Sequence, residues 1–164
     1  MVNVNFVVVN MESGKDVELL RARLRGLEAS YVKAVVMFGS RARGESGERS
    51  DVDLLVLHEG CEIDDPVLRR RHFYNVLREA VGEEFEDVTV VDMELRCFLK
   101  PTEITALLLN VYWDGVVVYD GTEMLRGFLG HVREKIVKSG LKRVRDGRAY
   151  YWVLPEPMKE VKIL

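Results

Sequence analysis

The sequence predicts an α/β fold in which a mixed β-sheet is flanked by helices and followed by a C-terminal helix and a β-hairpin. Three observations indicate this fold. Short apolar runs of strand length alternate with longer segments of helical periodicity. A helical segment joins the apolar runs at 51–58 and 86–93, which is typical of a parallel crossover. Asp146 and Gly147 separate two alternating runs near the end of the chain, which predicts a hairpin.

The first third of the chain predicts two strands around one helix. Residues 1–10 alternate and then run apolar, as a strand does. Residues 16–30 place apolar side chains at helical spacing with arginines on the other face, which predicts an amphipathic helix. The β-branched run at 32–38 is short enough for a buried strand. Residues 39–50 are polar and contain three glycines, so we expect a loop or irregular helix there.

The middle of the chain predicts a strand, a helix and a second strand. The apolar run at 51–58 is expected to be a buried strand. The acidic pair and proline at 64–66 are a strong helix start, and Gly82 is a stop, so the helix runs to about residue 81. Residues 86–93 form the next expected strand.

The last third predicts two further helices with a strand between them. Pro101 and Thr102 are expected to open a helix, with Thr102 as its N-cap. The Asp-Gly pair at 114–115 marks a turn before a strand over 116–119. A helix is expected over 123–138, ahead of the hairpin.

The length and composition indicate one small globular unit with an appendage. The chain has 164 residues, and we expect a core over 1–121 and a helix–hairpin appendage over 122–164. Hydrophobic residues make up 48%, which excludes a mainly disordered chain. The net charge of −3 excludes a globally basic nucleic-acid-binding coat. Cys61 and Cys97 lie far apart, which excludes a disulfide framework and a cysteine-rich zinc site.

The chain shows no targeting or membrane signal of its own. No apolar run reaches membrane-spanning length, and the first residues carry neither a basic segment nor a small-residue cleavage site. We therefore expect a cytoplasmic protein without a membrane partner.

One constellation carries chemistry: a glycine–serine pair followed by two aspartates. Gly39 and Ser40 end the apolar run at 32–38, where a glycine amide and a serine hydroxyl can cradle phosphate oxygens. Asp51 and Asp53 stand two apart on a strand, so their side chains share one face. Because adjacent carboxylates repel each other, this pair predicts a bound hard cation such as Mg²⁺.

A third carboxylate is expected on the neighbouring strand. Asp87 and Asp92 are the two candidates in the run at 86–93. In a parallel crossover the start of that strand lies beside the aspartate pair, and Asp92 stands roughly 16 Å further along at about 3.3 Å per residue. We therefore favour Asp87, which could complete a metal site and deprotonate an attacking hydroxyl.

These residues together resemble a known family. Gly39-Ser40, ten residues, Asp51-Val52-Asp53 and a later strand aspartate are similar to the DNA polymerase β-type nucleotidyltransferase superfamily. The GSRARGE stretch and the small size resemble its minimal nucleotidyltransferase branch, whose members are often paired with HEPN-domain toxins. The resemblance covers roughly residues 18–119. It implies a nucleotidyltransferase-like mixed sheet flanked by helices.

The resemblance also implies roles for single residues. Gly39 and Ser40 would bind the triphosphate tail of a nucleoside triphosphate, with Arg41 and Arg43 steadying it or the leaving pyrophosphate. Three carboxylates would be catalytic and would bind two Mg²⁺ ions, and these are Asp51, Asp53 and Asp87. The implied reaction moves a nucleoside monophosphate, AMP from ATP above the others, to a hydroxyl acceptor.

The acceptor and the partner leave alternatives open. The resemblance implies a tyrosine of a HEPN-type partner protein as the leading acceptor, with a small molecule as the enzymatic alternative. An antitoxin-like binding module with little catalysis is a competing function, against which the intact carboxylate pair stands.

The basic C-terminal segment raises a third alternative, transfer to a nucleic-acid end. Residues 131–164 carry nine Lys and Arg against four acidic residues, and the hairpin also holds Tyr150, Tyr151 and Trp152. Basic residues beside aromatic rings can bind RNA or DNA. We favour instead a hairpin whose rings pack on the core while its cations stay in water.

Overall fold

The computed structural model describes residues 14–47 and 50–164. A four-stranded sheet and a separate hairpin contain the strands β1 (Val32–Phe38), β2 (Val52–His58), β3 (Val88–Glu94), β4 (Val116–Asp120), β5 (Lys142–Asp146) and β6 (Ala149–Val153). The helices are α2 (Lys15–Leu24), α3 (Gly39–Ala42), α4 (Pro66–Val81), α5 (Leu95–Leu99), α6 (Ala106–Asp114) and α7 (Leu125–Ser139). The strand expected over 1–10 lies outside the described residues.

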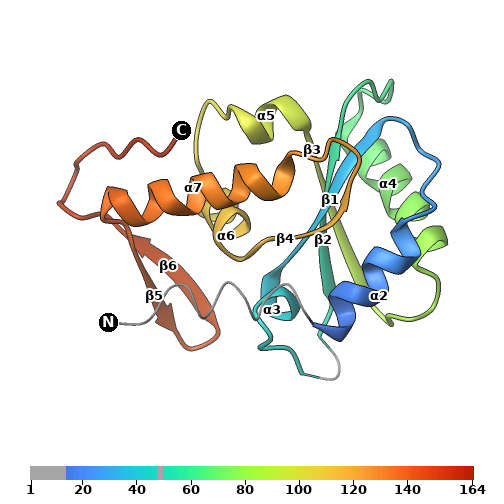
Figure 1. Cartoon of the computed structure of the whole chain (residues 1–164), viewed down its shortest axis with the longest axis horizontal. Helices are drawn as coiled ribbons and strands as arrows, with labels where there is room; N and C mark the ends of the chain where they lie inside the picture. Colours follow the sequence, from blue (N-terminus) through green and yellow to red (C-terminus); the bar gives the residue numbers. More distant parts are fainter. Residues whose placement is uncertain (1–13, 48–49) are drawn as a thin grey trace.

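The sheet is mixed, with strand order β3-β2-β1-β4. Strand β1 pairs antiparallel with both β2 and β4, whereas β2 and β3 are parallel. Helix α4 provides the crossover between the parallel strands, as predicted. Figure 1 shows α2 and α4 on one side of the sheet and α5, α6 and α7 on the other. The predicted fold class, including the C-terminal helix and hairpin, is therefore confirmed.

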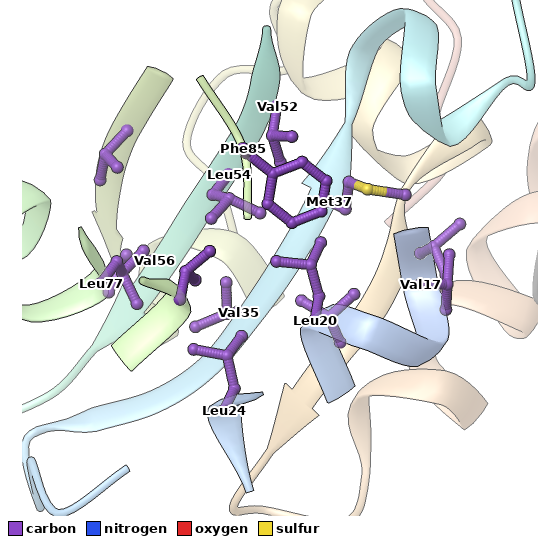
Figure 2. Packing of buried hydrophobic residues seen from close by; sticks show 14 of the residues in the cluster. Val17, Leu20, Leu24, Val35, Met37, Val52, Leu54, Val56, Leu77 and Phe85 are labelled. Atoms are coloured by element: carbon purple, nitrogen blue, oxygen red, sulfur yellow. The ribbon is translucent and has the colours of Figure 1, made fainter. Parts of the chain in front are cut away.

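Two hydrophobic cores fill the space on the two faces of the sheet. Val35 and Met37 of β1 pack under α2 and α4 in the first core, where Figure 2 shows the Phe85 ring between Leu54 and Met37. The intervening Ala34 and Val36 point into the second core, under α6 and α7. Alternating side chains of one strand thus serve both layers, so the middle of the sheet is apolar on both faces.

The helix boundaries confirm the predicted start of α4 and correct the expected start of α6. Asp65 caps α4, its carboxylate accepting from the amides of Val67 and Leu68 at 2.9 Å. The helix expected from Thr102 begins instead at Ala106, because the Thr105 hydroxyl accepts from the Leu108 amide.

Two further differences concern the end of the first helix and an additional helix after β3. The first helix ends at Leu24, well short of residue 30. Helix α5 follows β3 directly and was not expected. It buries only Phe98 among its five residues, so its sequence has too little periodicity to predict a helix.

The C-terminal elements join the second core. Helix α7 buries Leu125, Leu129, Val132 and Ile136 against it. Within 14–47 and 50–164, no helix is both long and apolar enough to cross a membrane.

Candidate active site

Gly39 and Asp53 bring the two halves of the predicted constellation into contact. Phe38, the last residue of β1, pairs with Asp53 near the start of β2. The chain then turns at Gly39, whose φ of +77° lies in the left-handed region that favours glycine. A Cβ at this position would stand 2.2 Å from Oδ2 of Asp53. Glycine is therefore required both by the turn and by the carboxylate beside it.

The aspartate pair lies on the face of the sheet covered by α6 and α7. Asp53 alternates with Val52 and Leu54, which point into the first core. Asp51 is exposed and accepts from the Thr89 hydroxyl at 3.4 Å, while Thr89 pairs with Asp53 across β2 and β3. Sequence reasoning did not single out Thr89, because only the register of the parallel pair places it there.

The surroundings of Asp53 raise the pKa of its carboxyl group. Burial raises the pKa of Asp53, and the neighbouring Asp51 carboxylate raises it further, against a smaller opposing effect of Arg43. Desolvation and like charge thus both disfavour the ionised form of Asp53. A cation between the two carboxylates would remove this penalty.

The two candidates for the third carboxylate occupy very different places. The main-chain oxygen of Asp87 accepts from the Val52 amide at 3.0 Å, so Asp87 stands beside Asp51 with an exposed side chain. Asp92 pairs with Val56 further along the strand and is buried in an ion pair with Arg69 at 2.6 Å. Asp92 therefore has a structural partner and lies away from the aspartate pair.

The structure does not gather the three predicted carboxylates into a closed metal cluster. In the part of the chain that the structure describes, no group of three or more His, Cys, Asp or Glu residues could hold a metal ion. The carboxylates of Asp51 and Asp53 are close enough to repel each other, and the backbone of Asp87 lies beside Asp51.

The two predicted arginines have intramolecular partners. Arg41 donates from Nε to the Ser50 carbonyl at 2.7 Å and from its guanidinium to Asp16 at 2.9 Å. Its guanidinium also lies 5.4 Å from the ring centroid of Phe85. These contacts tie the loop after β1 to helix α2. We call residues 39–47 and 50, which include the short helix α3, the site loop.

Arg43 faces the other way, towards the hairpin. It donates to Glu45 at 2.9 Å and to Asp114 at 3.3 Å, and it lies 4.8 Å from the ring centroid of Tyr150. Asp114, at the end of α6, is 3% exposed and also accepts two hydrogen bonds from Arg143 of β5, at 2.7 and 2.5 Å. One buried carboxylate thus holds both the site loop and the hairpin.

The aromatic residues of the hairpin take part in the same contact. The Tyr150 hydroxyl donates to Glu45, and its ring centroid lies 3.9 Å from the Arg143 guanidinium. Trp152 donates from its indole to Asn110 at 3.0 Å. Burial alone would raise the pKa of Glu45, but hydrogen bonds from Tyr150 and Arg43 leave that pKa below its ordinary value.

A pocket of about 460 Å³ opens between the site loop and the hairpin. We call it the loop–hairpin pocket, and its walls include Ser40, Arg43, Glu45, Ser50, Arg145 and Arg148. The sequence indicated only a basic hairpin of undetermined role. The net positive charge of the C-terminal segment was the signal that pointed to Arg145 and Arg148.

Comparison with known proteins identifies the family. A family model described as "Nucleotidyltransferase domain" matches residues 17–142, which is most of the chain. The chain belongs to the nucleotidyltransferase domain family. The resemblance stated from the glycine–serine pair and the two aspartates is therefore confirmed.

Relatives of this nucleotidyltransferase domain are similar over shorter stretches or at lower identity. The "Putative protein adenylyltransferase MJ1215" of Methanocaldococcus jannaschii is 48% identical over 40 residues, covering 24% of this chain and 46% of that protein. The chain thus spans less than half the length of this curated relative.

Solved structures are similar at low identity. A toxin-antitoxin structure with AMP-PNP shares 19% identity over 76% of this chain and 90% of its own, with a TM-score of 0.46. A mutant of the toxin-antitoxin MntA-HpeT shares 19% identity over 76% of this chain and 89% of its own, with a TM-score of 0.45.

Proposed function

We propose that this nucleotidyltransferase moves AMP from ATP to a hydroxyl group and releases pyrophosphate. The observation that carries the proposal is the contact between Gly39 and Asp53, which sets a phosphate-binding turn against a carboxylate pair. Membership of the nucleotidyltransferase family supports the reaction class. The acceptor oxygen forms a bond to the α-phosphorus, and the bond between that phosphorus and the pyrophosphate oxygen breaks.

The carboxylates suit Mg²⁺ as the metal. Hard carboxylate oxygens are its preferred protein ligands, and Mg²⁺ is commonly held by one or two carboxylates together with substrate phosphates. The raised pKa of Asp53 beside Asp51 marks the repulsion that a cation would offset. We propose that Asp51, Asp53 and Asp87 hold two Mg²⁺ ions. When bound, Mg²⁺ would offset negative charge on the carboxylates and on the phosphate oxygens.

The remaining residues bind and orient the substrates. The Gly39 amide and the Ser40 hydroxyl would donate to phosphate oxygens, since the turn places Gly39 beside Asp53 and Ser40 lines the loop–hairpin pocket. Arg43 would steady the triphosphate, for which it lies on the wall of the loop–hairpin pocket. Asp87 would accept the proton of the acceptor hydroxyl. Arg41 would act by holding the site loop, because its guanidinium is already bound to Asp16 and Ser50.

For the acceptor we propose a tyrosine hydroxyl of a HEPN-type partner protein. The relative from Methanocaldococcus jannaschii is named as a protein adenylyltransferase, which supports a protein acceptor. The similarity of the GSRARGE stretch to minimal nucleotidyltransferases supports the partner class.

The test combines labelled nucleotides with matched aspartate variants. The protein is incubated with Mg²⁺, each nucleoside triphosphate labelled at the α-phosphate in turn, and a purified HEPN-domain protein. We expect pyrophosphate release and tyrosine labelling with ATP by the wild type. Asp53→Asn should lose both activities, whereas Asp64→Asn, an exposed aspartate outside the site, should retain them. Undiminished labelling by Asp53→Asn would contradict the proposal.

A further inference from the structure

The loop–hairpin pocket is built from two parts of the chain that are far apart in sequence. Its site-loop wall lies within the residues matched by the nucleotidyltransferase family model, which end at 142. Its other wall consists of Arg145 and Arg148, in the hairpin beyond that match. Figure 1 shows the hairpin apart from the four-stranded sheet. The hairpin therefore adds to the family core a wall of its own.

The charge of the pocket is positive. Three arginines line it against a single carboxylate, that of Glu45. Glu45 is already engaged by Arg43 at 2.9 Å and by Arg145 at 3.7 Å. Among residues 14–47 and 50–164, Arg148 has no hydrogen-bonded or ion-paired partner. The pocket thus presents cationic groups in excess of the negative charge that the protein supplies.

The hairpin is held firmly enough to present these arginines at a fixed place. Arg143 forms a two-bond ion pair with the buried Asp114 and stacks on Tyr150. Trp152 is bound to Asn110 and packs edge-on against Trp113, at 5.8 Å between ring centroids. Because the hairpin is already fixed in place, ligand binding has a smaller entropic cost.

The position of the pocket relates it to the carboxylate pair. Ser40 lines the pocket, and the preceding Gly39 touches Asp53. A phosphate chain whose first group lies at the glycine turn can therefore extend past Ser40 towards Arg145 and Arg148. The hydroxyls of Ser40 and Ser50 add donors along this route.

We propose that Arg145 and Arg148 of the hairpin bind the terminal phosphates of the nucleoside triphosphate and then the leaving pyrophosphate. This inference rests on the proposed function and assigns the hairpin to the donor substrate. It makes the hairpin a part of the nucleotide site and gives its cations a ligand other than a nucleic acid. Arginine suits this task, because its planar fork donates two parallel hydrogen bonds to phosphate oxygens.

The test measures binding of inorganic tripolyphosphate, ATP and AMP by calorimetric titration of the full chain. The variant is Arg145→Gln with Arg148→Gln. Its matched control is Lys138→Gln with Lys142→Gln, which removes the same charge from the end of α7 and the start of β5, away from the hairpin turn. We expect the arginine variant to bind tripolyphosphate and ATP roughly tenfold more weakly or worse, and AMP as the wild type does. The control variant should match the wild type with all three ligands.

Several outcomes would overturn the inference. Tripolyphosphate affinity that is equal in the arginine variant and the wild type would remove the hairpin from the site. An equal loss of affinity in the lysine control would show that the net charge of the protein, and not the position of the two arginines, causes the loss. No binding of tripolyphosphate by the wild type would also overturn it.

The inference and the proposed function fail separately. If the wild type releases pyrophosphate from ATP but the arginine variant keeps its KM for ATP, the inference is wrong and the proposed function stands. If tripolyphosphate binding depends on Arg145 and Arg148 but no nucleotide is ever transferred, the phosphate pocket stands and the proposed function is wrong.

Discussion

Gly39 and Asp53 lie so close that a single methyl group on the glycine would stand 2.2 Å from a carboxylate oxygen. Gly39→Ala should therefore displace the Asp53 side chain and abolish nucleotide transfer. It should also destabilise the fold by about 2 kcal/mol, from left-handed strain and steric overlap. Gly44→Ala is the matched control, since its φ is +69° and nothing lies within 4 Å of an added Cβ.

Gly44→Ala should cost about 1 kcal/mol from strain alone and leave transfer intact. Urea unfolding gives the stability of both variants, and pyrophosphate release gives their activity. A Gly39→Ala protein that transfers nucleotide at the wild-type rate would show that the contact does not matter for the reaction.

Asp87 and Asp92 should respond in opposite ways to substitution. Asp87→Asn removes an exposed carboxylate beside the pair, so transfer should fall by about 10²-fold or more while the melting temperature stays unchanged. Asp92→Asn weakens the buried ion pair with Arg69, so stability should fall by about 2 kcal/mol while transfer persists in the folded fraction. Rate measurements and thermal unfolding on both variants check this. The reverse pattern would make Asp92 the functional residue.

Substitution of Asp114 is expected to lower the free energy of unfolding strongly. Asp114→Ala leaves Arg143 and Arg43 without their shared partner, and Arg143 is only 11% exposed. Removing one member of a buried ion pair costs about 3 kcal/mol or more. Chemical unfolding, followed by fluorescence of the adjacent Trp113 and Trp152, measures the loss. A change below about 0.5 kcal/mol would be typical of a surface position instead.

Glu45 predicts an acid-dependent contact between the site loop and the hairpin. The pKa of Glu45 is lower in the folded protein than its ordinary value of 4.5. The stability that ionised Glu45 contributes to the fold is therefore present above pH 4.5. It is lost as the pH falls through the lowered pKa. Glu45→Gln should therefore be less stable than the wild type at pH 7, by at most about 1 kcal/mol, and the difference should disappear in acid. Thermal unfolding against pH measures this, with the exposed Glu103→Gln as the control.

Local chemistry made most elements predictable. The helix start at 64–66, the stop at Gly82 and the turn at 146–147 depend on neighbouring residues, and the structure has all three as predicted. The end of the first helix and the start of α6 were misplaced. Thr105 competes with Thr102 as a cap, and only the hydrogen bond to Leu108 decides between them.

The placement of the candidate site residues was predictable where spacing along one or two strands defines it. Gly39 and Asp53 meet because the antiparallel pairing of β1 and β2 returns the chain to the same edge. The contact of Arg143 with Asp114 spans 29 residues, and that of Tyr150 with Glu45 spans 105. The periodicity of a sequence does not indicate which segments meet over such separations, so the contact between the hairpin and the site loop became visible only in three dimensions.

The apolar character of β1 on both faces has a consequence for how the chain folds. In a strand with one solvent-exposed face, a shift of the register by one residue would bury polar side chains and would be strongly unfavourable. In β1, Val35 and Val36 could exchange layers at little hydrophobic cost. The alignment of β1 with β2 must therefore be selected by the strand ends, where Gly39 leaves room for the Asp53 carboxylate and a bulkier residue would not. Gly39 thus also helps to select the register of β1 against β2 during folding, and we expect its replacement by a bulkier residue to yield misregistered sheets.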